Sequence, residues 1–331
     1  MGKITIVGLG LIGTSIGLGL KKANLKDIEI VGTDKDSEVS SRASKMGAID
    51  KASRDLIPAI QDTNMVILAT PVMAMKELME IIGPHLEEGA TVTDTGSTKS
   101  SVMAWAEEYL PSSVSFVGGH PMAGKEKSGP DAAEATLFNN TPYCIIPGKQ
   151  ADPSAVKSVA GLAEILGAKP MFMDAPEHDS FVAAISHLPM ILSIALVTST
   201  AKSPQWSEMA RLASTGYRDI TRLASGDPEM NRDICLTNAD FLVRWVDEII
   251  KELYEFRNNI KEGRESLLST FVQAWEARAR WLAGVTREEA KVELPTVGES
   301  FAGMLMGDRL ARKVKEITSR DKKDPTKYYK R

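Results

Sequence analysis

The chain has 331 residues, of which 43% are hydrophobic and 25% are charged, a composition typical of a globular protein of about two domains. Its net charge of −4 argues against a general nucleic-acid-binding protein, because neutralising phosphates requires a basic face. An anionic ligand would therefore need a local cationic pocket. The two cysteines, Cys144 and Cys235, show neither a disulfide framework nor the ligand spacing of a metal site, so we expect no metal.

The amino terminus reaches strand-like residues within three positions and lacks the features of a signal peptide, which predicts a cytoplasmic protein. The most apolar stretch runs from Phe181 to Val197 and contains Ser186, His187 and Pro189. Because it falls short of an unbroken membrane span, we expect a buried core helix and no membrane association.

Short β-rich runs alternate with amphipathic helical segments through the first half of the chain. The expected strands are Lys3 to Val7, Ile28 to Thr33, Met65 to Ala69, Thr91 to Thr93, Ser115 to Val117, Tyr143 to Ile146 and Lys169 to Met173. The expected helices are Leu11 to Lys22, Ser37 to Met46, Ala74 to Ile82, Lys99 to Tyr109 and Pro153 to Leu166. This alternation predicts a doubly wound α/β domain of the Rossmann type, with parallel strands, over residues 1–173.

After Asp174 the strand signals disappear, and helical periodicity predicts an all-α second domain over residues 174–286. The expected helices are Glu177 to Thr200, Ser207 to Ser214, Pro228 to Asn259 and Glu262 to Leu282. Apolar faces this extensive in a small domain suggest burial against a second subunit, so we expect a homodimer. Residues 287–331 form a carboxy-terminal extension whose last dozen residues are basic and expected to be solvated, not a nucleic-acid-binding tail.

A GxGxxG motif lies directly after the first predicted strand and opens the first predicted helix, which is the context that dinucleotide binding requires. Gly8 permits the tight turn, Gly10 lets the backbone approach a pyrophosphate, and Gly13 allows the helix to pack closely on the strand. Leu11 and Ile12 lie in the helix amino terminus, which offers unpaired amides to phosphates. The alternative is that these glycines only make a tight turn between strand and helix.

Asp34 ends the second predicted strand, 21 residues beyond Gly13, at the place expected for a ribose-binding carboxylate. Such a carboxylate would accept hydrogen bonds from the ribose hydroxyls and repel a 2′-phosphate. The sequence therefore predicts NAD in preference to NADP as the cofactor, although Lys35 is adjacent.

Four further motifs follow in order. They are Asp94-Thr95-Gly96-Ser97-Thr98-Lys99, His120-Pro121-Met122-Ala123-Gly124, Ser186-His187-Leu188-Pro189 and Gly216-Tyr217-Arg218-Asp219-Ile220-Thr221-Arg222. In this order and at these separations they resemble the DxxSxK, HPMxG, SHxP and (K/R)DxTR signatures of prephenate and arogenate dehydrogenases. The resemblance spans about Lys3 to Trp281 and implies an amino-terminal NAD domain followed by a helical dimerisation domain.

His120 is expected on a loop at the carboxyl end of a parallel strand, where open α/β sheets bind ligands. A neutral imidazole there can accept the proton of a hydroxyl that is being oxidised. By resemblance, Ser97 orients His120 or contacts nicotinamide and substrate, Lys99 contacts the substrate, and the Thr70-Pro71 turn contacts the cofactor. Each of these readings has a structural alternative. His120 could be a loop histidine bonded only to backbone, Ser97 and Lys99 could cap a helix, and Pro71 could simply start one.

Arg218 and Arg222 are four residues apart and project from one face if that turn is helical, so together they could hold a dianion. Arg222 aligns with the family's carboxylate-binding arginine, and a guanidinium suits bidentate binding of a carboxylate. The alternative is an exposed arginine paired with Asp219 or Asp233. The motif also suggests substrate contact for His187, which would otherwise be a core histidine. The implied substrate is a small dicarboxylate.

The sequence departs from the family at one position, because several prephenate-preferring members carry a second histidine directly after SHxP, where this chain has Met190. That departure leaves prephenate and arogenate both open as substrates. His178 and Asp179 match a further family pattern less closely, and His85 resembles a surface residue.

The resemblance implies that the enzyme oxidises and decarboxylates prephenate to 4-hydroxyphenylpyruvate, or arogenate to tyrosine, with His120 as the base. One alternative is a β-hydroxyacid or 6-phosphogluconate-type dehydrogenase, but those enzymes carry a lysine shortly before an asparagine where this chain has the SHxP motif. Another is a non-catalytic NAD-binding dimeric sensor, against which His120 and Ser97 argue.

Overall fold

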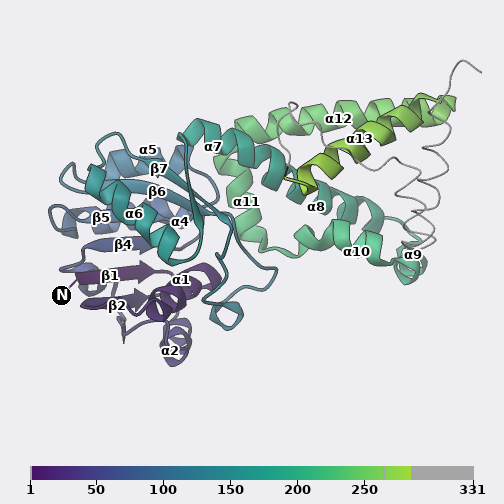
Figure 1. The fold of residues 1–331 in the computed structure, drawn as a ribbon. Coiled ribbons are helices and arrows are strands. Elements are labelled where there is room, and N and C mark those ends of the chain that lie inside the picture. The colour runs from purple at the N-terminus through teal and green to yellow at the C-terminus, as the bar shows by residue number, and fades with distance from the viewer. Residues whose placement is uncertain (1, 264, 285–331) are drawn as a thin grey trace, which may run out of the picture. The chain divides into compact units, whose positions relative to one another are not determined.

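The computed structural model describes residues 2–263 and 265–284, and the expectations for residues 287–331 lie outside that range. The chain divides into two compact units, Met1–Glu248 and Ile249–Arg331. The first unit contains a single eight-stranded sheet, flanked by helices and followed by a helical segment (Figure 1).

The sheet has the strand order β3-β2-β1-β4-β5-β6-β7-β8. Its strands are β1 (Gly2–Val7), β2 (Ile28–Thr33), β3 (Lys51–Ala52), β4 (Met65–Leu68), β5 (Thr91–Asp94), β6 (Ser115–Pro121), β7 (Pro142–Pro147) and β8 (Lys169–Phe172). The order reverses between β1 and β4, so the carboxyl ends of these two strands flank the crevice where such sheets bind ligands.

The doubly wound α/β class is confirmed, but the expectation of parallel strands throughout is wrong at one place. β7 runs antiparallel to β6, and β8 runs parallel to β7. The chain reaches β7 from β6 through residues 122–141 without the crossover helix that a parallel pairing needs. This return lengthens β6 beyond the expected Val117, since Val117 to Pro121 pair with β7.

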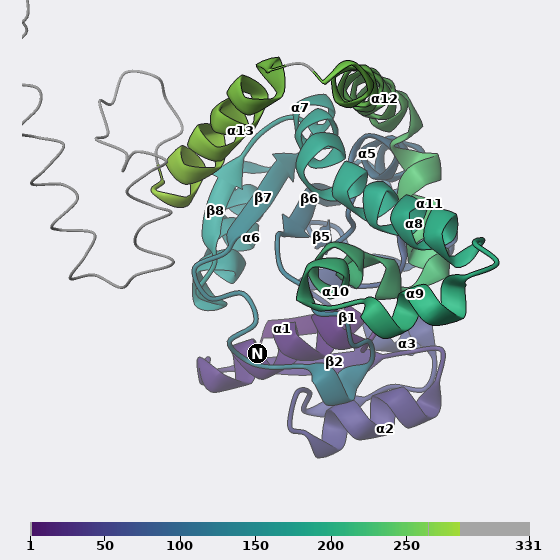
Figure 2. The ribbon, with the colours of Figure 1, turned by 90° about the vertical axis from the view of Figure 1, so that its right-hand side faces the viewer.

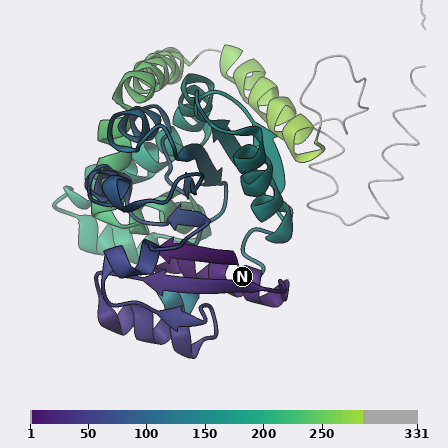
Figure 3. The same ribbon diagram turned by 90° about the vertical axis from the view of Figure 1, so that its left-hand side faces the viewer.

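Helices cover both faces of the sheet (Figures 1 and 3). One apolar cluster joins α1 (Leu11–Lys22) and α6 (Pro153–Ile165) to the sheet, through residues such as Ile16 and Leu162. A second cluster joins α4 (Val72–Ile82) and α5 (Ser100–Tyr109), through residues such as Met79 and Val102. The remaining helices of this part are α2 (Ser37–Lys45) and α3 (Leu56–Ile60). Short β3 and α3 carry no periodic pattern and were not expected.

Beyond β8 the first unit is helical, as expected, but with more interruptions (Figure 2). Its elements are α7 (Ala175–Val182), a π-helical turn (Ala183–His187), α8 (Leu188–Ala201), α9 (Trp206–Leu212), α10 (Thr215–Thr221), a 3-10 turn (Arg222–Ser225) and α11 (Pro228–Thr237). The π turn lies where Pro189 supplies no amide for a regular i→i−4 bond, and Leu188 N donates to Ala183 O instead. The helix expected from Glu177 to Thr200 is therefore present within Ala175–Ala201, with the π turn inside it.

The single helix expected from Pro228 to Asn259 is two helices, because Asn238 caps α11 in a non-helical conformation and α12 (Ala239–Glu262) begins after it. In the second unit, α13 (Ser266–Leu282) follows, and Phe256 stacks on Phe271 with ring centroids 6.0 Å apart.

The stretch Ala175–Ala201 is long and apolar enough to cross a membrane on length and composition alone. Only 28% of its most apolar window is buried, so the expected buried core helix is only partly buried in the single chain. His178, Asp179 and His187 in this stretch are buried and bonded to other side chains or amides of the first unit, an arrangement typical of a packed helix in a water-soluble fold.

Candidate active site

The turn after β1 has a shape that only glycine permits at two positions. Gly8 has a φ of +92°, and a Cβ there would lie 2.5 Å from the carbonyl oxygen of Ala69. A Cβ on Gly13 would lie 1.9 Å from the Gly8 carbonyl oxygen. The two glycines thus bring α1 against β1 and the end of β4, as the motif predicts.

Gly10 differs from its two partners, because a Cβ on it would meet no protein atom within 4 Å. It is the N-cap of α1 and supplies no capping side chain, and no acidic residue lies in the first turn with Leu11 and Ile12. The amides of this helix end therefore face open space with a positive dipole, which suits a pyrophosphate. Beside the loop, the hydroxyl of Thr70 is buried without a partner, next to Pro71 at the start of α4. These residues fit a dinucleotide.

Asp34 follows β2 and is half-buried. Its Oδ2 accepts a hydrogen bond from Leu9 N at 2.7 Å, and its Oδ1 accepts one from Asp36 N at 3.0 Å. The carboxylate therefore tethers the glycine loop to the end of β2. Each oxygen keeps acceptor capacity for a ribose hydroxyl, since a carboxylate offers about four lone-pair positions.

His120 lies inside strand β6, opposite Cys144 of β7, and not on a loop as expected. The added antiparallel pairing carries the strand past the point where its parallel pairing with β5 ends. Only 8% of His120 is exposed. Burial, followed by unfavourable electrostatic interactions with His178, Lys99 and His187, holds the pKa of His120 well below its ordinary value. The imidazole is therefore neutral near pH 7, as a proton acceptor must be.

Beneath His120 lies a fully buried ion pair between Lys99 Nζ and Asp94 Oδ2. Asp94 also accepts backbone hydrogen bonds from Gly96 at 2.7 Å and from Gly119 at 3.1 Å. Lys99, expected to contact the substrate, has no exposed side-chain surface, and its ammonium neutralises a buried carboxylate. Burial, followed by the charge of Asp94, raises the pKa of the enclosed Tyr143 hydroxyl. The pair fixes the strand end that presents His120.

The neighbours of His120 come from α7. Its Nδ1 lies 2.8 Å from His178 Nε2, and His178 Nδ1 lies 2.9 Å from Asp179 Oδ1. Asp179 in turn accepts the amides of Lys99 and Ser100, each at 2.7 Å. Burial alone would raise the pKa of Asp179, but the hydrogen bonds from His178, Ser100 and Lys99 outweigh it and lower that pKa. The Asp179 carboxylate is thus connected to His120 through two successive hydrogen bonds, by way of His178.

His187 is also buried, and Asn238 organises its surroundings. Asn238 Nδ2 lies 3.1 Å from His187 Nδ1 and donates to the carbonyl oxygen of Asp179 at 2.9 Å. Because Nδ2 can only donate, His187 Nδ1 is an acceptor and its proton is on Nε2. Burial lowers the pKa of His187 to about 4, partly opposed by the charge of Asp179. His187 therefore offers a neutral N–H donor.

The two arginines are placed differently from these histidines. Arg222 begins the 3-10 turn after α10, its side chain is 56% exposed, and its Nη1 lies 3.1 Å from Glu126 Oε1. Arg218 lies in α10 and is also exposed. Neither Asp219 nor Asp233 is the partner of Arg222 in this structure, since Asp233 pairs with Arg232.

Ser97 lies between β5 and α5 and is half-buried. The helix cap expected as its alternative role does not form, since Lys99 is the N-cap of α5 and Asp179 accepts the first amides. His120 Nδ1 is held by His178, so any contact between Ser97 and His120 is limited to the other ring nitrogen.

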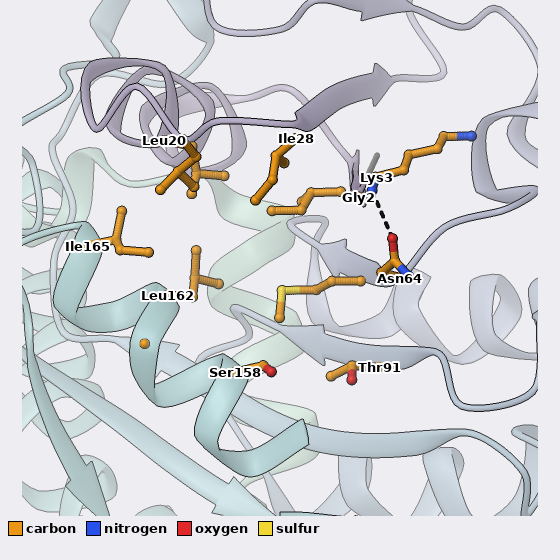
Figure 4. A pocket seen from close by; sticks show the side chains of 13 residues that line it. Gly2, Lys3, Leu20, Ile28, Asn64, Thr91, Ser158, Leu162 and Ile165 are labelled. Atoms are coloured by element: carbon orange, nitrogen blue, oxygen red, sulfur yellow. Dashed lines mark hydrogen bonds between the residues drawn. The ribbon is translucent and has the colours of Figure 1, made fainter. Parts of the chain in front are cut away.

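A separate, mostly apolar pocket lies at the opposite, amino-terminal edge of the sheet (Figure 4). It is lined by the first residues of several strands, among them Lys3, Ile28 and Thr91, and by Leu162 and Ile165 of α6. Lys3 N donates to Asn64 Oδ1 there at 2.9 Å.

A glycine-lined dinucleotide cradle next to a buried neutral histidine, at the carboxyl edge of a doubly wound sheet, defines a nucleotide-dependent dehydrogenase with a helical second part. Family models agree. Residues 16–172 match the nucleotide-binding domain of prephenate dehydrogenase, and residues 174–274 match its dimerization domain. The chain belongs to the prephenate dehydrogenase family.

Individual relatives support this membership. A prephenate dehydrogenase of Bacillus subtilis (strain 168) is 40% identical over 278 residues, which cover 83% of this chain and 75% of the relative. The crystal structure of prephenate dehydrogenase from A. aeolicus, in complex with hydroxyphenyl propionate and NAD+, is similar with a TM-score of 0.78 and 31% identity, covering 85% of this chain and 98% of that one. Synechocystis arogenate dehydrogenase has a TM-score of 0.70 and 30% identity, covering 84% and 99%.

Proposed function

We propose that this chain oxidises and decarboxylates prephenate with NAD, yielding 4-hydroxyphenylpyruvate and carbon dioxide. The observation that carries the proposal is His120, a buried imidazole that stays neutral near pH 7 at the ligand-binding edge of the sheet. Family membership supplies the reaction class, and the Bacillus relative, which is named for prephenate, favours that substrate over arogenate.

The fit of the glycine loop and Asp34 assigns NAD to the crevice between β1 and β4. Gly10 and the amino end of α1 hold the pyrophosphate, Thr70 and Pro71 border it, and Asp34 binds the ribose. When bound, NAD accepts a hydride from the carbon that carries the hydroxyl. The missing Cβ at Gly10 leaves the space that the phosphates need.

His120 accepts the proton of the substrate hydroxyl as the carbonyl forms. The resulting dienone acid loses carbon dioxide when the ring becomes aromatic, which makes the reaction effectively irreversible. Ser97, on the neighbouring loop, is the polar side chain available to contact nicotinamide or substrate. Lys99 acts below the site, where its buried pairing with Asp94 stabilises the end of β6.

Arg222 binds a substrate carboxylate, for which its bidentate geometry is suited. Its bond to Glu126 is exposed on both sides, and such a pair contributes little, so an incoming carboxylate can displace Glu126 at small cost. Arg218, four residues earlier in α10, assists as a second cation, and His187 donates Nε2–H toward the substrate.

The active form is a homodimer. Large apolar side chains are exposed on the helices of both units, including Ile185 and Leu236 in the first and Leu253 and Leu268 in the second. A second copy would remove this area from water. The dimerization-domain match covers most of these helices. Two free cysteines, Cys144 and Cys235, suit a reducing cytoplasm.

The decisive experiment follows NADH formation in separate reactions with prephenate, arogenate and 3-hydroxyisobutyrate. We expect turnover with prephenate, weaker turnover with arogenate and none with 3-hydroxyisobutyrate. Carbon dioxide should appear in step with NADH. Binding of NAD without turnover of any of the three would refute the enzymatic proposal and leave a cofactor-binding sensor. Preferred turnover of arogenate would overturn the choice of substrate alone.

A further inference from the structure

The buried chain from His120 through His178 to Asp179 has a defined direction. Asp179 accepts two backbone amides, of Lys99 and Ser100, in addition to His178, and these bonds keep it ionised. An ionised carboxylate has no proton to donate. His178 must therefore donate its Nδ1 proton to Asp179 Oδ1.

The next bond follows from the first. His178 is completely buried, an environment that favours a ring with a single proton over the charged form. With that proton on Nδ1, His178 presents a lone pair at Nε2. That lone pair faces His120 Nδ1 at 2.8 Å, and His120 must supply the proton of this bond. The proton of neutral His120 is thereby fixed on Nδ1. Its Nε2 is left as the unprotonated atom.

We propose that His178, anchored by the carboxylate of Asp179, is a positioning residue that holds His120 in the Nδ1–H tautomer and reserves Nε2 for the proton of the substrate hydroxyl. The opposite tautomer would place a proton where the base must accept one. The inference rests on the proposed function for its catalytic meaning, but the tautomer is a property of the protein alone.

The same chain stabilises the charge that the reaction creates. As the substrate O–H bond breaks and the Nε2–H bond forms, His120 becomes an imidazolium with protons on both nitrogens. The groups that face it are Lys99 at the start of α5, His178 on α7 and His187 at the end of the π turn, all of which disfavour a positive charge on His120. The charge of Lys99 is balanced by Asp94. Asp179 supplies the negative charge that His120 senses through His178.

The test compares two substitutions of His178 that separate hydrogen bonding from packing. His178→Phe keeps a planar ring of similar size but removes the acceptor. His178→Gln changes the shape but can accept the His120 Nδ1 proton through Oε1. The proposal predicts that kcat falls by about 10²–10⁴-fold in His178→Phe, by analogy with other catalytic histidines that lose the group fixing their tautomer, with KM little changed. His178→Gln should recover most of kcat. If His178 only fills space, the order of the two variants reverses.

Nitrogen-15 NMR of the ring nitrogens reads the tautomer directly, in the full-length protein without substrate. In the unmodified protein, and in His178→Gln, the proton of His120 should be on Nδ1. In His178→Phe, the population with the proton on Nε2 should increase. A proton on Nε2 in the unmodified protein would overturn the proposal, as would a folded His178→Phe protein with unmodified kcat. Failure of the proposed reaction would abolish turnover in all three proteins without altering the NMR result, so the two failures are distinguishable.

Discussion

The two groups that the proposed reaction needs most, His120 and Arg222, lie in opposite environments. His120 is 8% exposed and bonded through His178 to a carboxylate, whereas the side chain of Arg222 is 56% exposed and paired with an exposed Glu126. Burial lowers the pKa of His120 and fixes its ring, which suits proton transfer. Exposure leaves Arg222 able to exchange one carboxylate for another, which suits substrate capture.

The contrast separates a rigid part, built around the end of β6 and α7, from an exchangeable part on the 3-10 turn after α10. The rigid part is crosslinked: Thr98 bonds Thr237, Asp179 holds the start of α5, and Asn238 joins Asp179 to His187. These bonds connect the start of α5 with α7 and α11 and hold in place Asp179, which bonds His178, the neighbour of the His120 ring. The exchangeable part depends on one exposed ion pair, of a kind that contributes at most about 1 kcal/mol.

The largest expected effect is on the rigid part. His120→Asn should lower kcat by about 10²–10⁴-fold, because it removes the general base, while NAD affinity stays nearly unchanged. The measurement is kcat from initial rates, with NAD affinity from a fluorescence titration. His85→Asn, at an exposed histidine, is the matched control and should behave like the unmodified protein. A His120→Asn protein that retains half of the normal kcat would remove His120 from the mechanism.

The same environment shifts the expected pH dependence. An unperturbed imidazole would lose activity on acidification through about pH 6.5. Because the pKa of His120 is lowered, its neutral form persists below that pH, and the acid limb of kcat/KM should lie on the acid side of 6.5.

A smaller effect is expected for the exchangeable part. Arg222→Ala should raise KM for the substrate by roughly 10- to 100-fold, since a half-exposed guanidinium is worth less than a buried one, and leave the melting temperature unchanged. Arg222→Lys should recover little, because one ammonium cannot reproduce two parallel bonds. KM and kcat are measured at two ionic strengths, with Arg211→Ala, on exposed α9, as control. Near-normal KM in a stable Arg222→Ala protein would move the carboxylate site to Arg218.

A third substitution tests the cofactor cradle, which combines both kinds of environment. Asp34→Asn keeps an oxygen for the Leu9 amide but loses the charge that repels a 2′-phosphate. We expect kcat/KM for NAD to fall roughly 10-fold, equivalent to about 1.4 kcal/mol, and the preference over NADP to narrow. Asp34→Ala also removes the hydrogen bond that tethers the glycine loop, so kcat/KM for NAD should fall further than in Asp34→Asn. Equal use of NAD and NADP by the unmodified protein would contradict the assignment.

Much of the fold follows from local pattern, since the bounds of β2 and α1 are as expected and most other elements of the α/β part agree within a few residues. The pattern failed where a distant contact decides the structure. Pairing with the antiparallel β7 lengthens β6, and the residues Val117 to Pro121 show no pattern of their own that predicts this longer strand. The helical pattern from Glu177 to Thr200 likewise gave no sign of the π turn at Ala183–His187.

The site was predictable to a similar extent. Motif spacing identifies the glycines, Asp34, His120 and Arg222 as candidates. It gives no sign that Lys99 is buried against Asp94, that His178 bonds His120, or that Asn238 bonds His187. The partners in these pairs are 5 to 58 residues apart in the sequence, and only folding brings them together. The interruption at Asn238, a polar residue in a predicted helix, was the one available signal for its role.

The last expected effect concerns stability and leaves activity aside, and it distinguishes a buried neutral histidine from an exposed one. Burial holds the pKa of His187 at about 4 in the folded protein, whereas an unfolded histidine titrates near 6.5. Between these values the unfolded chain binds a proton that the folded protein does not. Stability is therefore lost as pH falls below about 6.5, by about 2 kcal/mol at pH 5 for this group alone.

His187→Gln removes that proton uptake, so the fall in melting temperature between pH 7 and pH 5 should be smaller in the variant, by a few degrees. Carboxylates titrate in both proteins, so their effect on the melting temperature cancels when the change between pH 7 and pH 5 in the variant is subtracted from that in the unmodified protein. His85→Gln, at an exposed position, should leave the fall unchanged. If His187→Gln loses as much stability between the two pH values as the unmodified protein does, His187 is protonated in the folded protein at pH 5. Its bond from Asn238 must then be replaced, and the assignment of a neutral N–H donor to His187 fails.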